Sequence, residues 1–413
     1  MRLQIQLDTF FTKLNISFEL VLLCLFFITL PLKNSYNSIS ILLLLLFSLP
    51  KFSKENLNDL RNYKIILAYF LFSCISLFYT EDLDKGLNTL LGHSVFLVFP
   101  LIFINIKFTK EHLKRAHNIF IIWICLLAFY SEVFTVYNLL ESGKSLSLWF
   151  RKDFSYITLG NIIGIHPPYM SLFTSYSILV LIDKIGHNKL KNVGYSFVVI
   201  FLLFYTIHLS SRLPIVALLL VSSMFILKKI SLHNSVAKTT FKFLVLMGII
   251  FTLLFSVRSS RYRFVEVFGM QYTSGLYIKS GPAKLDQWAA AFYANNNKLF
   301  GNGIGDVNNS VRESNMKHGL TKNADRKYNA HNQYIQTYVG LGLVGLVLLL
   351  GFLFYCWSFN KPLLNPYNYY LIYLVIVLFS ESYFQRHQGI VFIAFLFCLI
   401  QFTKTQPTSL AND

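Results

Sequence analysis

Apolar runs recur along nearly the whole of this 413-residue chain, and they constrain its fold more than any other feature. Hydrophobic residues make up 54% of the sequence, aromatic residues make up 17%, and the mean hydropathy is +0.52. A composition of this kind, with apolar segments that approach the roughly 20 residues of a helical crossing, is typical of membrane proteins. We therefore expect a polytopic membrane protein and exclude a soluble enzyme.

The runs predict an all-α membrane protein with about 12 transmembrane helices and one large outer loop. No small-residue cleavage motif follows the first run, so we interpret it as a retained span rather than a signal peptide. The spans divide the chain into residues 1–257 (nine spans), 258–332 (the loop) and 333–413 (three spans). They are expected at residues 16–31, 38–50, 64–79, 87–106, 118–140, 167–183, 194–209, 213–227, 243–257, 333–357, 367–380 and 389–402.

The distribution of basic residues predicts the orientation of these spans. With the N-terminus inside, the inner loops and termini hold 19 of the 37 Lys and Arg residues, against seven in the short outer loops, which satisfies the positive-inside rule. The other 11 lie in residues 258–332, which carry a net charge of +6. That charge fits either solubility and contact with anionic headgroups or an anionic substrate, and charge alone favours neither. We expect no nucleic-acid partner.

Ionisable residues in the spans are concentrated toward the outer surface. A charge at mid-bilayer costs about 2.5–3.5 kcal/mol or more, so this bias predicts a shared polar cavity that opens outward. A transporter is expected to carry such residues near the midplane instead. The residues toward the outer surface are His93, Glu132, His166, His208, Arg212, His331, Arg386 and His387.

The outer loop contains a predicted amphipathic helix. Apolar residues recur at i, i+3, i+4 and i+7 from Leu285, and Lys284 and Asp286 begin the polar side. Such a helix can lie flat on a bilayer. A second helix is expected from Val307, capped by Asp306 and ending at Gly319; the first helix is expected to be one of several short amphipathic helices in the loop.

A glycine-rich stretch, residues 301–306, separates these two helices. Its spaced glycines, Gly303 and Gly305 among them, could present backbone N–H groups to a phosphate. No strand precedes the stretch, however, so a dinucleotide fold is unsupported and a plain turn is the favoured alternative.

Three basic residues could take part in chemistry. Arg212 follows Ser211 and precedes Pro214 at a tight outer turn, where a helix N-terminus and a guanidinium together suit an anionic phosphate. The alternative is an arginine that extends to lipid headgroups. Lys284 alone is typical of a solvated cation. His331 begins an apolar helix, where a neutral imidazole can accept a proton near neutral pH or simply lie at the interface.

The sequence resembles the O-antigen ligase and O-antigen polymerase superfamily of bacterial membrane glycosyltransferases, which are GT-C-like. The similarity is strongest over residues 210–350, where His331-Asn332-Gln333-Tyr334 leads into a glycine-rich span and Arg212 lies at an outer turn. It is weakly visible at residues 166–169 and 381–389 as well. The resemblance implies multiple spans in the bacterial inner membrane and an active site that faces the periplasm.

The resemblance also implies roles for individual residues. Members transfer a glycan from an undecaprenyl-diphosphate carrier to an acceptor hydroxyl, with basic residues on the diphosphate and a histidine near the acceptor. Arg212 would be the first diphosphate ligand and His331 the catalytic histidine. The second ligand is commonly an arginine four residues before a tryptophan; here Lys284 stands four before Trp288, and a lysine supplies a point charge rather than a bidentate fork.

One further position departs from the family pattern, because Lys298 stands where proline is common. Three arginines offer alternatives to Lys284 as the second diphosphate ligand. The three are Arg258, Arg261 and Arg263. The further candidate substrate contacts are Asn332, Trp288, His166, Tyr169, Arg386, Gly303 and Gly305.

These residues support one mechanistic hypothesis. Arg212 and Lys284 neutralise the departing diphosphate, His331 removes the proton from the attacking hydroxyl, and direct attack inverts the anomeric centre. No metal and no cofactor is expected. The acceptor separates a ligase (a lipid A core sugar, which we favour) from a polymerase or a protein O-oligosaccharyltransferase. A lipid-linked glycan transporter or flippase and a non-catalytic scaffold are alternatives from other classes.

Overall fold

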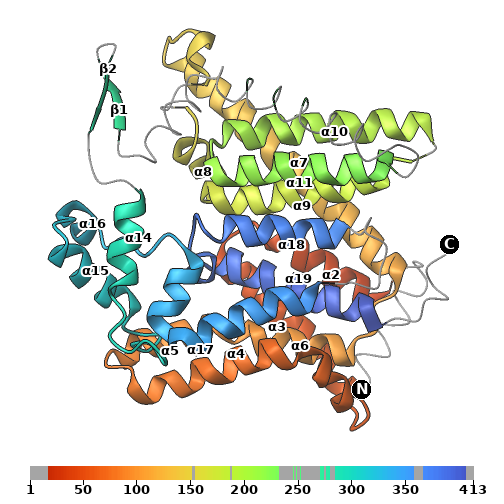
Figure 1. Ribbon diagram of the computed structural model, residues 1–413. Helices are drawn as coiled ribbons and strands as arrows, with labels where there is room; N and C mark the ends of the chain where they lie inside the picture. Colours follow the sequence, from red (N-terminus) through yellow and green to blue (C-terminus); the bar gives the residue numbers. More distant parts are fainter. Residues whose placement is uncertain are drawn as a thin grey trace.

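The computed structural model describes residues 17–150, 154–186, 188–231, 270–273, 276–279, 284–357 and 366–405, with the single positions 245, 248 and 252. Long helices form a bundle that accounts for most of these residues (Figure 1). In chain order they are α2 (Phe18–Thr29), α3 (Asn34–Ser48), α4 (Lys64–Ser76), α5 (Leu83–His93), α6 (Val95–Asn105), α7 (Lys110–Glu141), α9 (Pro167–Lys184), α10 (Lys189–His208), α11 (Arg212–Ser231), α17 (Gln333–Cys356), α18 (Pro366–Val377) and α19 (His387–Thr405).

Short elements connect the long helices. The connections hold 3-10 turns, short helices and one pair of strands. They are η1 (Leu49–Lys51), η2 (Asn56–Tyr63), η3 (Leu77–Tyr79), η4 (Leu146–Leu148), α8 (Ile157–Ile162), β1 (Met270–Thr273), β2 (Leu276–Lys279), α14 (Lys284–Phe292), α15 (Val307–Lys317), α16 (Thr321–Asp325) and η6 (Tyr383–Gln385).

The helices agree with the spans expected from the sequence. A helix covers every expected span except residues 243–257, most of which lie outside the described residues. Within the described residues, 6 helical segments are long and apolar enough to cross a membrane, and α2 and α18 are apolar but shorter. The expectation of a helical membrane protein is therefore confirmed, while the count of about 12 spans stays a prediction.

One element departs from the all-α expectation. Strands β1 and β2 pair antiparallel, with Met270 opposite Lys279 and Thr273 opposite Leu276. The two segments contain Tyr272, Tyr277 and Ile278, residue types that favour strands. Apolar periodicity cannot reveal a hairpin this short, so the all-α expectation did not include it.

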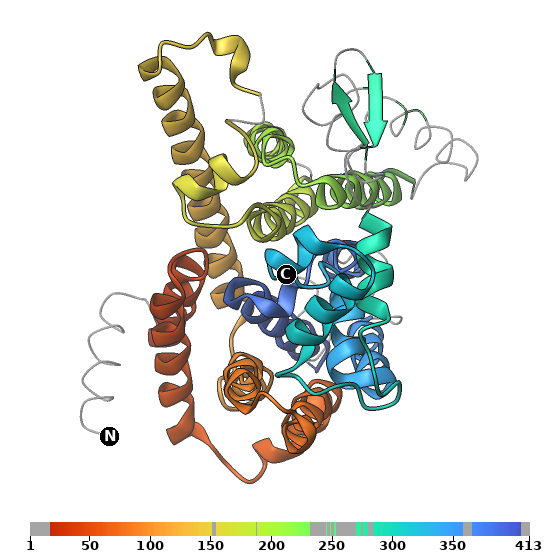
Figure 2. The same cartoon turned by 90° about the vertical axis from the view of Figure 1, so that its left-hand side faces the viewer.

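The loop elements gather at one end of the bundle, which we call the loop end (Figures 1 and 2). Figure 2 looks onto this end, with α14, α15 and α16 nearest the start of α17. The beginnings of α9, α11, α17 and α19 also lie here, because these helices run away from the loop end. Residues far apart along the chain therefore meet at one surface.

A dense aromatic core holds α19 in the middle of the bundle. The ring of Phe395 lies 4.6 Å from that of Phe26, 5.6 Å from that of Phe99 and 5.5 Å from that of Phe103. Edge-to-face and tilted aromatic pairs at such distances add to the stability gained by burial. Because α19 is fixed in this way, the connection that precedes it, residues 378–386, has a fixed position at the loop end.

The glycine-rich stretch packs against a kink in α17. Gly342 has φ +60°, a conformation that suits glycine, and a Cβ there would lie 2.3 Å from the carbonyl oxygen of Leu299. The N–H groups of Asn302 and Gly303 donate to the carbonyls of Val339 and Gly340 at 2.8 and 3.0 Å. The favoured plain turn is therefore what the structure has.

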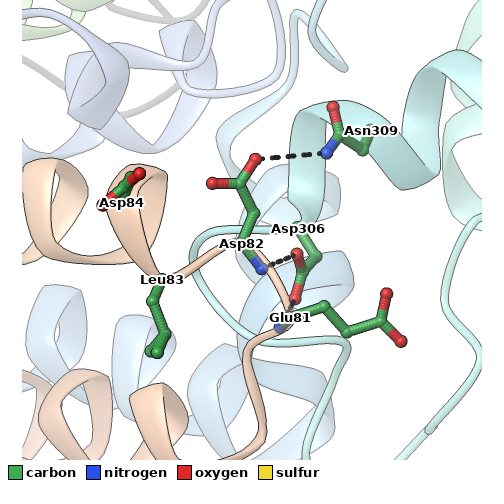
Figure 3. A pocket seen from close by; sticks show the side chains of 6 residues that line it. All are labelled: Glu81, Asp82, Leu83, Asp84, Asp306 and Asn309. Atoms are coloured by element: carbon green, nitrogen blue, oxygen red, sulfur yellow. Dashed lines mark hydrogen bonds between the residues drawn. The ribbon is translucent and has the colours of Figure 1, made fainter.

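The second loop helix forms as expected, but its expected cap does not. Helix α15 begins at Val307, and Gly319 lies just beyond its end with φ +71°. Asp306 has helical backbone angles and makes no cap hydrogen bond to α15. Its carboxylate instead accepts from the N–H groups of Glu81 and Asp82 at 2.8 and 2.9 Å, which lie just before α5 (Figure 3). The carboxylate that we expected to cap α15 therefore binds backbone N–H groups at the start of α5 instead.

Candidate functional site

A buried carboxylate, Glu381, organises the polar residues at the loop end. It follows α18 and is 7% exposed. Its Oε2 lies 3.3 Å from Nδ1 of His331, and its Oε1 accepts from the N–H of Ser382 at 3.1 Å. Burial alone would raise the pKa of Glu381, but the hydrogen bond to His331 and the charges of His331, His166 and Lys284 hold that pKa below its usual value. Glu381 is therefore a carboxylate at neutral pH.

His331 is held in a strained backbone conformation. Its φ is +46°, which is uncommon for a residue with a side chain and is often found at functional sites. The N–H of His331 donates to Oδ1 of Asn329 at 2.9 Å, and the ring of Tyr328 packs edge-on at 5.4 Å. The imidazole is half-buried, so it remains accessible from outside the protein.

The start of α17 is joined to the segment that carries Glu381. The side chain of Asn332 caps α17 by accepting from the N–H groups of its first turn, and its own N–H donates to Oγ of Ser382 at 3.3 Å. The N–H of Gln333 donates to the carbonyl of Leu378 at 2.8 Å, and its Oε1 accepts from the N–H of Phe384 at 2.8 Å. These bonds set the distance between His331 and Glu381.

Lys284 is the first residue of α14 and is half-buried. Burial lowers the pKa of Lys284 to about 8; the carboxylate of Glu381 opposes this shift, and the charge of Arg212 adds to it. Lys284 therefore lies close enough to both Glu381 and Arg212 for their charges to interact. It remains largely protonated at neutral pH.

Arg212 is the first residue of α11, directly after a tight turn in which Ser210 has φ +50°. The positive end of the α11 dipole lies at the same place. The charge of Arg212 acts on Lys284, and the charges of Lys284 and His331 act on Glu381, so residues from α11, α14 and the segment before α17 lie in one region of the loop end.

His166 and two further predicted contact residues border the same cluster. Burial lowers the pKa of His166 to about 4; Glu381 opposes this shift, and Arg386 and His331 add to it. The guanidinium of Arg386 lies 5.8 Å from the ring centre of Tyr169. Each of these residues comes from the beginning of α9 or from the connection before α19.

Unpaired polar atoms surround this cluster. Within the described part of the chain, Nδ1 of His166, the hydroxyl of Tyr169 and Nε1 of Trp288 are buried and have no hydrogen-bond partner. Buried polar atoms are normally paired, so each of these atoms has capacity for water or a ligand. All three belong to residues that the sequence predicted as substrate contacts.

Other predicted contacts have structural tasks. Asn332 is 2% exposed and serves as the α17 cap. Gly303 donates its N–H to Gly340, and a Cβ on it would lie 2.2 Å from Oγ1 of Thr80. A Cβ on Gly305 would lie 2.3 Å from the carbonyl of Asp82. The two glycines allow close packing, and the N–H of Gly303 is engaged by backbone, which favours the plain turn over the phosphate cradle.

The expected single outward cavity is also wrong, because several outer residues form separate pairs. His93 Nδ1 lies 3.1 Å from Oγ of Ser73, and His387 Nε2 lies 2.9 Å from Oδ1 of Asn37. His208 bonds Glu132, as described below. These buried polar groups satisfy one another inside the bundle, so they have no need of a common water-filled space.

The pair of His208 and Glu132 also includes a third residue, Trp149. Nδ1 of His208 lies 2.9 Å from Oε1 of Glu132, and Nε2 lies 3.0 Å from the carbonyl oxygen of Trp149. The indole N–H of Trp149 donates to Oε2 of Glu132 at 3.1 Å. The three residues join α7, α10 and the connection between α7 and α9, so Glu132 has the packing role that the sequence left open.

An acidic hollow at the loop end stands apart from the Glu381 cluster. This open cavity of about 530 Å³ lies between the start of α5 and α15 (Figure 3). Its lining includes four carboxylates, which would repel a diphosphate. The lining residues are Glu81, Asp82, Leu83, Asp84, Asp306 and Asn309.

Glu381 is the residue that sequence reasoning missed. It belongs to a stretch that weakly resembles the family, but no role followed from its position. The available signal was an acidic residue in a short connection between two apolar runs, within five residues of Arg386. Arg258, Arg261 and Arg263, the alternatives to Lys284, lie outside the described residues.

The chain was compared with known proteins and protein families. No curated protein matches it. A family model described as O-antigen ligase matches residues 197–350. The matched stretch begins in α10, ends in α17 and includes Arg212, Lys284 and His331. The match over these residues supports the O-antigen ligase and polymerase superfamily that the resemblance of the motifs predicted.

Proposed function

We propose that the protein is an O-antigen ligase-like glycosyltransferase that moves a glycan from undecaprenyl diphosphate to a hydroxyl of a lipid A core sugar. One observation carries the proposal: Arg212 at the start of α11, Lys284 at the start of α14 and His331 just before α17 lie in one region of the loop end with the buried carboxylate of Glu381. The matched family supplies the reaction class.

The loop end faces the periplasm in this proposal, with the bundle in the bacterial inner membrane. Basic residues of the short connections at the opposite end support that orientation through the positive-inside rule. The residues at that opposite end include Lys51, Lys54, Lys107, Lys110, Lys189, Lys191, Lys228 and Lys229.

The donor diphosphate binds between Arg212 and Lys284. Both cations are near the buried cluster, where charge interactions are stronger than in open water. The guanidinium can bond two phosphate oxygens, and the ammonium adds a point charge. As the bond between sugar C1 and the diphosphate oxygen breaks, negative charge grows on the leaving group, and the two cations stabilise it.

His331 acts as the general base, and Glu381 positions it. A carboxylate can only accept a hydrogen bond, so Nδ1 of His331 carries the proton that faces Glu381 and Nε2 is left as the proton acceptor. Glu381 also stabilises the imidazolium that forms on proton transfer, as a carboxylate does behind a catalytic histidine.

The bond changes follow from these positions. The acceptor oxygen attacks C1 as its proton moves to Nε2 of His331, and the C1–oxygen bond to the diphosphate breaks on the opposite side. The electron pair of that bond leaves with undecaprenyl diphosphate, and the anomeric centre is inverted. The scheme uses no metal and no cofactor, because the diphosphate is already an adequate leaving group.

Transfer by the purified protein tests the proposal. A synthetic undecaprenyl-diphosphate glycan would be offered with one of three acceptors: lipid A core, a second carrier-linked unit or a serine-containing peptide. We expect product on lipid A core; product on only one of the other two would make the protein a polymerase or a protein O-oligosaccharyltransferase.

His331→Ala should remove this activity, whereas His318→Ala, at the end of α15, should leave it intact. Absence of transfer to all three acceptors, together with movement of the donor across proteoliposomes, would replace the proposal with a transporter or flippase.

A further inference from the structure

Helix α14 turns its apolar side away from the protein. Its buried residues are small: Ala290 and Ala291 lie against α15 and α17. On the opposite side of the helix, Leu285 is 60% exposed and Phe292 is 50% exposed. A loop helix that ends in water would normally bury its large apolar residues and expose the small ones. The ring of Phe292 stacks on Tyr338 of α17 at 4.9 Å and still stays half exposed, so the inverted arrangement favours an apolar surface outside the protein.

The axis of α14 is roughly perpendicular to the axes of the bundle helices, as a helix lying in the membrane plane would be. In Figure 1 α14 stands upright at the loop end, while α4 and α17 run across the view. If the bundle helices cross the bilayer, α14 lies along its plane. Helices that rest in the membrane interface have this direction and one continuous apolar face.

The segment after α14 continues the same apolar surface toward the spans. Leu299 and Phe300 are exposed, and the N–H of Leu343 in α17 donates to the carbonyl of Lys298 at 2.9 Å. The ring of Phe300 lies 6.4 Å from that of Phe72, which belongs to α4. Residues 298–300 are therefore level with the ends of two apolar helices rather than beyond them.

The surface next to this segment is the lipid-facing side of the bundle. Exposed apolar side chains continue along α4 and α17 from the loop end. They are Leu71 and Ile75 of α4, Phe78 of the adjoining η3, and Leu343 and Val347 of α17. A row of large apolar residues on a spanning helix contacts lipid, so an apolar patch that is continuous with this row contacts lipid as well.

We propose that residues 284–300 form an interfacial element whose apolar face, Leu285, Phe292, Leu299 and Phe300, rests in the outer leaflet of the membrane. The partner is the boundary between phospholipid headgroups and acyl chains. Lys284 and Lys298 border the face, where an ammonium can reach anionic headgroups while its stem lies along apolar surface.

This placement sets the depth of the Lys284 ammonium in the membrane. Its contact with the donor diphosphate at that depth rests on the proposed function. The diphosphate of a polyprenyl carrier lies at headgroup level because its tail is in the hydrocarbon. Lys284 begins α14, so an α14 seated in the interface holds the ammonium at that same level. The donor can then reach Lys284 by lateral diffusion, without leaving the membrane.

Depth-dependent quenching tests the element directly. A genetically encoded fluorescent amino acid would replace Leu285 or Phe292 in the otherwise native full chain, reconstituted in phosphatidylethanolamine and phosphatidylglycerol vesicles. Glu313, an exposed residue of α15, provides the matched control. We expect nitroxide lipids to quench the probes at 285 and 292 severalfold more than the probe at 313, and aqueous iodide to give the reverse order.

Iodide quenching at 285 and 292 equal to that at 313 would overturn the proposal. Where one probe prevents folding, Phe300 offers a second position on the same face. The measurement uses no glycan and no acceptor, so it is independent of the transfer assay. Failure of transfer with lipid quenching at 285 would reject the proposed function and leave the interfacial element in place.

Discussion

In the described part of the chain, two histidine–carboxylate pairs lie toward the loop end of the bundle, and their environments differ. In the His208–Glu132 pair the imidazole side chain is fully buried, and both ring nitrogens have partners. In the His331–Glu381 pair the imidazole is 27% exposed, and only Nδ1 has a hydrogen-bond partner among the described residues. The hydrogen-bonding capacity of the imidazole is fully used in the first pair and only partly used in the second.

The difference shows what separates a structural imidazole from a reactive one. Both ring nitrogens of His208 have partners inside the bundle, so neither is left for a substrate. His331 is oriented by its carboxylate on one side and leaves its second nitrogen for a substrate. A cation also lies near the His331–Glu381 pair, since the charge of Lys284 acts on Glu381. Each prediction below sets one pair against the other.

The largest effect is expected from the two histidines. His331→Ala should lower transfer by about 10²–10⁴-fold, the usual contribution of a general base, with an unchanged thermal midpoint. His208→Ala should retain turnover per folded molecule but unfold at lower temperature, because a buried pair that loses one partner costs about 3–5 kcal/mol. Turnover and thermal unfolding in detergent measure both. Loss of turnover in a folded His208→Ala protein would remove the distinction.

The two carboxylates should differ in the same sense. Glu381→Gln should lower kcat by about 10²-fold, less than the loss of the base itself, because the imidazole loses its fixed tautomer and the charge behind it. Glu132→Gln should affect mainly stability. Glu381→Asp should recover part of the activity, because it keeps a carboxylate behind the imidazole. A kcat of Glu381→Gln equal to that of the native protein would show that Glu381 does not position His331.

The pH dependence should reveal Lys284. Its pKa is lowered to about 8 by burial, so the cation is present below that pH and is lost as the pH rises through it. We expect kcat/KM to fall with a midpoint near 8 and the fall to move to higher pH in Lys284→Arg. In Lys284→Ala activity should be low throughout, by about 10²-fold, the effect of losing one charge-stabilising group. An unchanged alkaline limb in Lys284→Arg would assign it to another group.

The smallest effect is expected at Asn332, the α17 cap that helps to hold His331 beside Glu381. Asn332→Ala removes the side-chain oxygen that accepts from the first turn of α17, which costs about 1 kcal/mol. The thermal midpoint should fall slightly, and turnover should fall only a few-fold. Asn332→Asp, which keeps the acceptor, should restore both. A loss as large as that of His331→Ala would mean that Asn332 itself contacts substrate.

The sequence predicts the parts of this protein that depend on local chemistry. Apolar runs of nearly span length predict helices such as α7 and α17, and the spacing from Leu285 predicts α14. The short apolar helix α2 is predicted as well, although its length does not establish a crossing. Basic residues at turns and a histidine before a span predict Arg212 and His331 as candidates.

The remainder depends on contacts between distant segments. Asp306 follows the rules for a helix cap, but the N–H groups before α5 take its carboxylate. Gly303 suits a phosphate loop in sequence, yet α17 approaches it closely enough to take its N–H. Glu381 has no local motif and gains its importance only from His331 and Lys284, which approach it from other helices. No periodicity or spacing encodes those approaches.

A structure of the His331→Ala protein with an undecaprenyl-diphosphate glycan in a lipid nanodisc tests the central claim most directly. The account predicts that the diphosphate lies between Arg212 and Lys284, with the sugar C1 facing position 331 beside Glu381. A diphosphate bound near His208 and Glu132, or at the opposite end of the bundle, would contradict it.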